Sequence, residues 1–235
     1  MNDHDFHDFH DFHTVRRDQT DEDLGACSGR LAIPYAGQTR MRLTITSGMS
    51  DARVRVDPDA TDLIAIESSE GFPPQLRVSA SELRVSWPRT LGSWLCTVLA
   101  GECRDIELVL HPAVDWSLLI RGGLSRFEAD FASGQLACME ISGGVSDVRL
   151  DLPTPRVVVP VRVSGGASEL GLRRPVDAGV SLGVRGGISR LWLDEQRFDA
   201  IGGSARLATG LMRPDAPHYA VEISGGACGL VVAGR

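Results

Sequence analysis

The sequence predicts an all-β fold in which short strands and tight turns repeat along the chain. Apolar and polar residues alternate in short runs, and Gly-Gly pairs recur at nearly constant spacing. Glycine is abundant at 26 residues, whereas aromatic residues make up only 6% of the chain. Alternation with a period of two is typical of strands with one buried face, and a repeat of about 20 to 50 residues is typical of solenoids.

Length and composition favour one domain that follows a short tail. The chain has 235 residues, of which 43% are hydrophobic, so it can bury a sizeable core. Its net charge of −7 argues against a nucleic-acid partner, because such binding depends on clustered basic residues. No apolar run is long enough for a transmembrane segment, and the N-terminus does not resemble a secretory signal.

The cysteines indicate a reducing compartment. They are five in number, unevenly spaced and without a Cys-x-x-Cys pair: Cys27, Cys96, Cys103, Cys138 and Cys228. We therefore expect reduced thiols and a cytoplasmic location, with peripheral attachment to a membrane as the alternative. Cys96 and Cys103 would pair only in an oxidising compartment.

Residues 1–23 form a tail of repeated His-Asp-Phe triplets and a charged run, and its composition predicts disorder. His4, His7, His10 and His13 recur at every third position with aspartates between them. This pattern could hold zinc, nickel or copper weakly, although it matches no rigid site. A repetitive, disordered tail or a misassigned start is the favoured explanation.

Residues 24–235 are predicted to form a single β-solenoid domain. Its first part, residues 31–112, is rich in strands that turns such as Asp-Pro and Gly-Phe-Pro-Pro separate, which favours hairpin-like pairs. The alternating runs cover residues 41–45, 52–56, 63–66, 76–78, 83–85 and 106–110.

The second part, residues 113–235, repeats one short motif: an apolar residue, any residue, Gly-Gly, an apolar residue and Ser. The first glycines of the pairs are residues 122, 143, 165, 186, 202 and 225, at steps of 21, 22, 21, 16 and 23 residues. The last two copies are degenerate, and Ser47 replaces the first glycine in an earlier copy at residues 45–52.

The Gly-Gly pair is interpreted as a corner between two strands. Glycine accepts positive φ and allows neighbouring coils to approach closely. Apolar residues two apart on both sides of the pair would face one core, and Pro or Asp residues would close a second turn. The prediction is a right-handed, β-helix-like stack of two-strand coils of about 21 residues, about 4.8 Å apart.

Stacking aligns equivalent residues into columns. The expected structural turn ladder consists of Gly122, Gly123, Ser125, Gly143, Gly144, Ser146, Gly165, Gly166, Ser168, Gly186, Gly187 and Ser189. The serines would satisfy backbone groups of the turn, because a nucleophile elbow needs a further glycine and a helix that this pattern lacks. The next column, Arg126, Asp147, Glu169 and Arg190, would help to fix the register.

Two other features could bind a partner. Residues 91–100 form an apolar segment, with Leu91, Trp94, Leu95, Val98 and Leu99, that either caps the core or contacts a protein or membrane surface. The last coil, residues 221–232, has no capping segment after it. Because exposed strand edges template pairing, this coil predicts a homo-oligomer that stacks through the end of the solenoid.

The chain resembles the bacterial toastrack family, also called putative adhesins. The likeness rests on the N-terminal strand pairs, on the strand Ile106-Glu-Leu-Val-Leu-His-Pro112 and on the strand-Gly-strand repeats that follow, and it covers about residues 38–235. The resemblance implies a non-enzymatic module, often attached to membrane stress-response or signalling proteins. The family pattern commonly includes a membrane anchor, which this sequence lacks.

These observations predict a non-enzymatic binding or scaffold module without a cofactor. The first hypothesis is a protein-interaction platform in bacterial envelope stress or signalling, where the setting comes from the resemblance and the protein partner is unknown. The alternative is a self-assembling structural scaffold that stacks through its uncapped C-terminal coil. Convergent acid, base and nucleophile groups are not visible in the sequence, so an enzyme is not expected.

Overall fold

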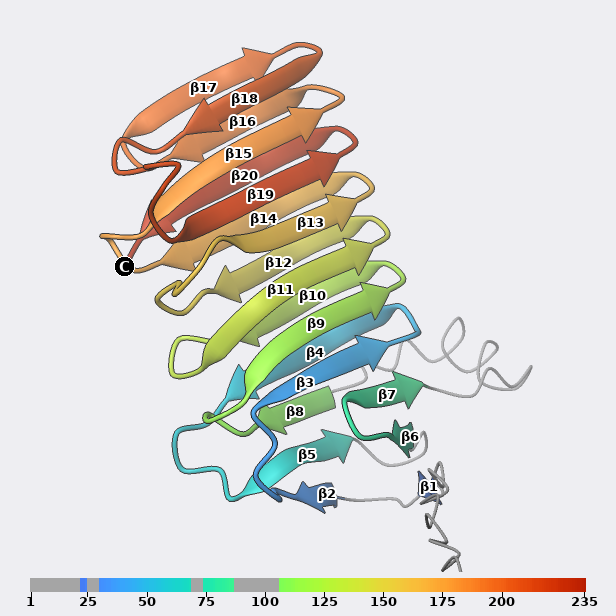
Figure 1. Cartoon of the computed structure of the whole chain (residues 1–235). Coiled ribbons are helices and arrows are strands. Elements are labelled where there is room, and N and C mark those ends of the chain that lie inside the picture. Colours follow the sequence, from blue (N-terminus) through green and yellow to red (C-terminus); the bar gives the residue numbers. More distant parts are fainter. Residues whose placement is uncertain (1–21, 25–29, 69–73, 87–105) are drawn as a thin grey trace, which may run out of the picture.

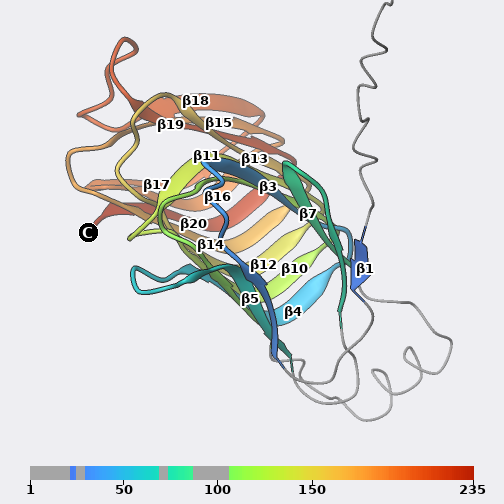
Figure 2. The same ribbon diagram turned by 60° about the horizontal axis from the view of Figure 1, so that its bottom comes forward.

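The computed structural model describes residues 22–24, 30–68, 74–86 and 106–235, and these residues are arranged in two mixed β-sheets (Figure 1). The described part of the chain contains strands and turns but no helix, and neither sheet closes into a barrel. The all-β prediction is therefore confirmed. In Figure 2, the layer with β3, β11, β13 and β19 lies over the layer with β4, β10, β12 and β20.

We name the two ten-stranded sheets A and B. In spatial order, sheet A consists of β1 (Glu22–Leu24), β6 (Gln75–Val78), β7 (Glu82–Ser86), β3 (Arg40–Ile45), β9 (Asp115–Arg121), β11 (Gln135–Ser142), β13 (Val159–Ser164), β19 (His218–Ser224), β15 (Gly179–Arg185) and β18 (Ser204–Ala208). Sheet B consists of β17 (Gln196–Ile201), β16 (Ile188–Leu193), β20 (Ala227–Gly234), β14 (Ala167–Arg174), β12 (Val145–Asp151), β10 (Leu124–Asp130), β4 (Met49–Val56), β8 (Ile106–Leu110), β5 (Asp62–Ser68) and β2 (Arg30–Pro34).

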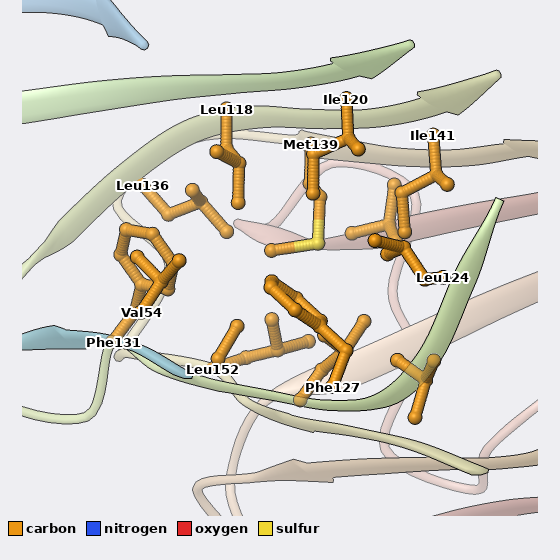
Figure 3. Packing of buried hydrophobic residues seen from close by; sticks show 14 of the residues in the cluster. Val54, Leu118, Ile120, Leu124, Phe127, Phe131, Leu136, Met139, Ile141 and Leu152 are labelled. Carbon is orange, nitrogen blue, oxygen red and sulfur yellow. The ribbon is translucent and has the colours of Figure 1, made fainter. Parts of the chain in front are cut away.

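The core lies between the sheets and follows from the alternation in the sequence. In β9, the side chains of Trp116, Leu118 and Ile120 are buried, and the residues between them are partly exposed. Figure 3 shows Phe127 of β10 pointing toward Met139 of β11 across the space between the sheets. Because one face of each strand is apolar and the other polar, the two sheets bury one continuous hydrophobic cluster.

The middle of both sheets is built from parallel strands joined at the Gly-Gly turns. In sheet A, β3, β9, β11, β13, β19 and β15 pair in parallel, and in sheet B, β4, β10, β12, β14, β20 and β16 do the same. At the N-terminal end, β2, β5 and β8 pair antiparallel, as do β6 and β7. Of these pairs, β6 and β7 are consecutive in the chain and form a hairpin, whereas β2, β5 and β8 are not consecutive, so the expected hairpin-like pairing is met only in part.

The C-terminal coil is not at the end of the stack, and this corrects the prediction of an uncapped C-terminal edge. Strand β19 lies between β13 and β15, and β20 lies between β14 and β16. The stack ends instead in β17 and β18, which pair antiparallel with β16 and β15. Consecutive copies of the Gly-Gly step present nearly the same backbone, so the local pattern does not determine their spatial order. Stacking through an exposed C-terminal coil is therefore excluded.

Candidate functional site

Several predicted site residues lie outside the described residues. These are the segment with Leu91, Trp94, Leu95, Val98 and Leu99, and the histidines His4, His7, His10 and His13. Their proposed roles in partner contact and metal binding stay predictions. Within the described ranges, no group of three His, Cys, Asp or Glu side chains is placed to hold a metal ion. No helix in those ranges is long and apolar enough to span a membrane.

The first glycines of the Gly-Gly pairs form the tightest contact between coils. Gly122, Gly143 and Gly165 have φ of 143°, 152° and 150°. A Cβ atom on Gly143 would lie 2.5 Å from the carbonyl oxygen of Gly122, and one on Gly165 would lie equally close to that of Gly143. Backbone hydrogen bonds continue through the turns, for example from the amide of Gly143 to the carbonyl of Ser164 at 2.9 Å. Glycine is therefore required at Gly122, Gly143 and Gly165 by both φ and space.

The serine column is also present. In register, Ser50 pairs with Ser125, Ser125 with Ser146, and Ser146 with Ser168. Cys228 of the inserted C-terminal coil then stands between Ser168 and Ser189. Hydrogen bonds with Ser189 and Arg190 lower the pKa of the Cys228 thiol. Cys138 and Cys228 are both free thiols.

The column after the serines has a backbone feature that the sequence did not reveal. Asp51, Arg126, Asp147, Glu169 and Arg190 all have φ between 48° and 57°. This left-handed conformation is uncommon for residues with a side chain, and here it recurs at one position of every coil. These charged residues lie at the same end of strands of sheet B, and β20 lies between the strands of Glu169 and Arg190.

Two ion pairs hold charged side chains of this column in place. Arg126 donates two hydrogen bonds to the carboxylate of Asp51. Arg190 donates to Glu169 at 2.6 Å, although the C-terminal coil separates their strands. Gly229 occupies the column position between them, and a Cβ there would lie 2.6 Å from the Glu169 carboxylate. The contact between Glu169 and Arg190 therefore passes over an inserted coil.

A charged groove of about 640 Å³ lies at the end of this column, on the outer face of sheet B. The described parts of β5 and β8 reach Ser68 and Ile106, whereas β4 continues past them beside β10. The charged residues that line the groove come from five strands: Asp51, Arg53, Glu67, Glu107, Arg126, Glu128, Asp147 and Arg149.

Glu128 is at the centre of the ion pairs in the groove. Arg53 donates two hydrogen bonds to one oxygen of its carboxylate at 3.0 and 3.1 Å, and Arg149 donates one to the other oxygen at 3.2 Å. All three side chains remain substantially exposed. Among the described lining residues, five carboxylates and three guanidinium groups leave an excess of two negative charges. Such a surface can exchange its own ion pairs for those of a charged ligand.

An apolar patch occupies the same outer face near the other end of sheet B. Trp192 is 49% exposed and Val231, its neighbour in register, is 41% exposed. The guanidinium of Arg197 lies 5.3 Å from the centre of the Trp192 ring. The outer face of sheet B therefore changes from charged to apolar along the stack.

Comparison with known proteins supports the fold but assigns no family. No protein-family model and no curated protein matches the chain. Among solved structures, the fold is similar to that of a putative cell adhesion protein from Clostridium sporogenes, with a TM-score of 0.66 and 16% sequence identity. The match covers 88% of this chain and 98% of that chain. At this identity the likeness shows a shared fold alone, and the toastrack resemblance rests on the sequence motifs alone.

Proposed function

We propose that the chain is a non-enzymatic binding module whose Gly-Gly coils form a β-solenoid of the toastrack kind. Parallel pairing of equivalent coils in both sheets supports the solenoid part of this proposal. The protein of similar fold is a putative cell adhesion protein, which favours a binding role. The toastrack resemblance adds a setting in bacterial envelope stress or signalling.

The groove around Glu128 is the proposed binding surface, and its ligand is a charged segment of a protein partner. The observation that carries the proposal is the gathering of eight charged side chains from five strands in one groove. Exposed ion pairs contribute only about 0 to 1 kcal/mol, so a partner can displace them at low cost. Because the groove has an excess of carboxylates, we expect the partner segment to be rich in Lys and Arg.

The test is a charge reversal with a matched control. Glu128→Arg places a third positive charge beside Arg53 and Arg149. Glu140→Arg makes the same change on the outer face of sheet A, where Glu140 accepts a hydrogen bond from Arg162 at 2.7 Å. The Glu128 and Glu140 side chains are both 42% exposed, so the two variants differ in location rather than burial.

The measurement is quantitative mass spectrometry of proteins captured from a lysate of the organism that encodes the chain. We expect the wild type and Glu140→Arg to retain the same basic partner and Glu128→Arg to lose it. Raising the salt concentration should weaken the capture, because salt screens exposed charges. Equal capture by both variants would exclude the groove as the binding surface.

A further inference from the structure

The end of the stack formed by β17 and β18 has an unpaired edge in each sheet. Among the described strands, β17 pairs only with β16 and β18 only with β15 (Figure 1). The turn at Gly202 and Gly203 connects them. An edge strand presents backbone amide and carbonyl groups that can pair with another strand.

The side chains of this end form a symmetric pattern about the turn. Phe198 and Leu207 each lie four residues from the nearer glycine of the turn, are partly buried and pack against the core. Asp199 and Arg206 each lie three residues from it and are exposed. Each strand therefore has an apolar side chain facing inward and a charged side chain facing outward at matching heights, and the two charges are opposite.

We infer that this end binds the same end of a second copy of the chain, with β17 of each copy antiparallel to β18 of the other. A two-fold axis parallel to the strands keeps the turns of both copies on the same side. It places Asp199 opposite Arg206 of the second copy and Phe198 opposite Leu207 of the second copy. Each contact occurs twice because the interface is isologous. Both sheets and the core then continue from one copy into the other.

The charges favour this arrangement over pairing of identical strands. In full antiparallel register, β18 against β18 of a second copy would bring Arg206 opposite itself. In the crossed arrangement, in which β17 of each copy pairs with β18 of the other, Asp199 gives up its exposed contact with Arg197, at 3.4 Å. It gains a contact with Arg206 of the second copy. Within the described residues Arg206 forms no ion pair, so the interface supplies a partner for it. Like charges opposite each other would be unfavourable on paired strands.

Charge reversal tests the pairing. The measurement is sedimentation equilibrium of the full chain over a concentration series from low to high micromolar. Asp199→Arg and Arg206→Asp should each raise the dimer dissociation constant by roughly 30-fold or more, because every dimer contains the altered contact twice. The double variant restores opposite charges and should dimerise nearly as well as the wild type. Arg213→Asp and Asp215→Arg, in the exposed loop after β18, are the matched controls and should have no effect.

The outcomes separate this inference from its alternatives. A wild-type chain that stays monomeric throughout the series overturns it. A dimer that Asp199→Arg weakens but Arg206→Asp leaves intact, or one that the double variant does not restore, overturns the crossed pairing. Circular dichroism checks that each variant is folded. Glu128→Arg should leave the dimer unchanged, so failure of the groove proposal and failure of this inference are distinguishable.

Discussion

Replacing one glycine of a Gly-Gly pair should disrupt the stack, whereas replacing its neighbour should not. Gly143 has a φ of 152°, and a Cβ on it would lie 2.5 Å from the carbonyl oxygen of Gly122. Gly144 lies outside the positive-φ region, and the nearest atom to its Cβ would be the carbonyl oxygen of Gly166 at 3.7 Å. Gly143→Ala and Gly144→Ala therefore add the same methyl group one residue apart, in opposite steric situations.

The expected magnitude follows from two costs at Gly143. Holding alanine at this φ costs about 1 to 3 kcal/mol. The coils of Gly122 and Gly143 must also separate, which weakens the backbone hydrogen bonds between them, from Gly122 to Ser142 and from Leu124 to Gly144, now 2.8 and 3.0 Å. Each such bond contributes about 0.5 to 1.5 kcal/mol. We expect Gly143→Ala to lower the free energy of unfolding by about 2 to 6 kcal/mol and Gly144→Ala to change it by less than about 1 kcal/mol.

Urea denaturation followed by circular dichroism measures the difference. The midpoint should fall for Gly143→Ala at an unchanged slope, which shows that the surface exposed on unfolding is the same. Equal midpoints for the two variants would refute the argument that the first glycine sets the distance between coils. A Gly143→Ala chain that does not fold, beside a folded Gly144→Ala chain, would support it.

Three further predictions concern single side chains. Arg190→Leu should raise the pH at which Cys228 is half alkylated, because it removes a hydrogen bond that lowers the pKa of the thiol; an unchanged alkylation profile would disprove this link. Asp194→Asn should destabilise the fold by about 1 to 3 kcal/mol in thermal unfolding, and more than Arg174→Met, because it leaves the buried Arg174 guanidinium without its carboxylate. Burial raises the pKa of Tyr219, so the unfolded chain ionises first and stability should fall above about pH 10; Tyr219→Phe should flatten this decline.

The strands themselves could be predicted from the sequence because alternation is a local property. The run Ile106–Leu110 coincides with β8, and the run at residues 41–45 lies within β3. The Gly-Gly corners were predictable for the same reason. A positive φ and a close approach of the neighbouring coil each require glycine at that residue, so the requirement is visible in the local sequence. Residues 52–56 likewise fall within β4.

The groove could not be predicted, because its residues meet through pairings that skip long stretches of chain. Arg53 and Glu128 are 75 residues apart, and so are Asp51 and Arg126. They become neighbours because β4 pairs with β10, although β5 to β9 lie between these strands in the chain. Exposed charged residues on alternating positions look alike in every strand, so nothing in the sequence distinguished these from the others.

The C-terminal coil shows why a repeat period does not give the order of a stack. Strands β15 and β16 pair with β19 and β20 on one side and with β18 and β17 on the other, so the last residues of the chain connect residues 179–208 to both sheets. The Gly-Gly step is the same whichever coil lies beside it, and it therefore carries no information about neighbours. The one local mark is Gly229, where the other coils have a charged residue. A Cβ at residue 229 would lie 2.6 Å from the Glu169 carboxylate, so glycine leaves room for the contact between Glu169 and Arg190 across the inserted coil. This signal in the sequence can be interpreted only once the spatial neighbours of the last coil are known.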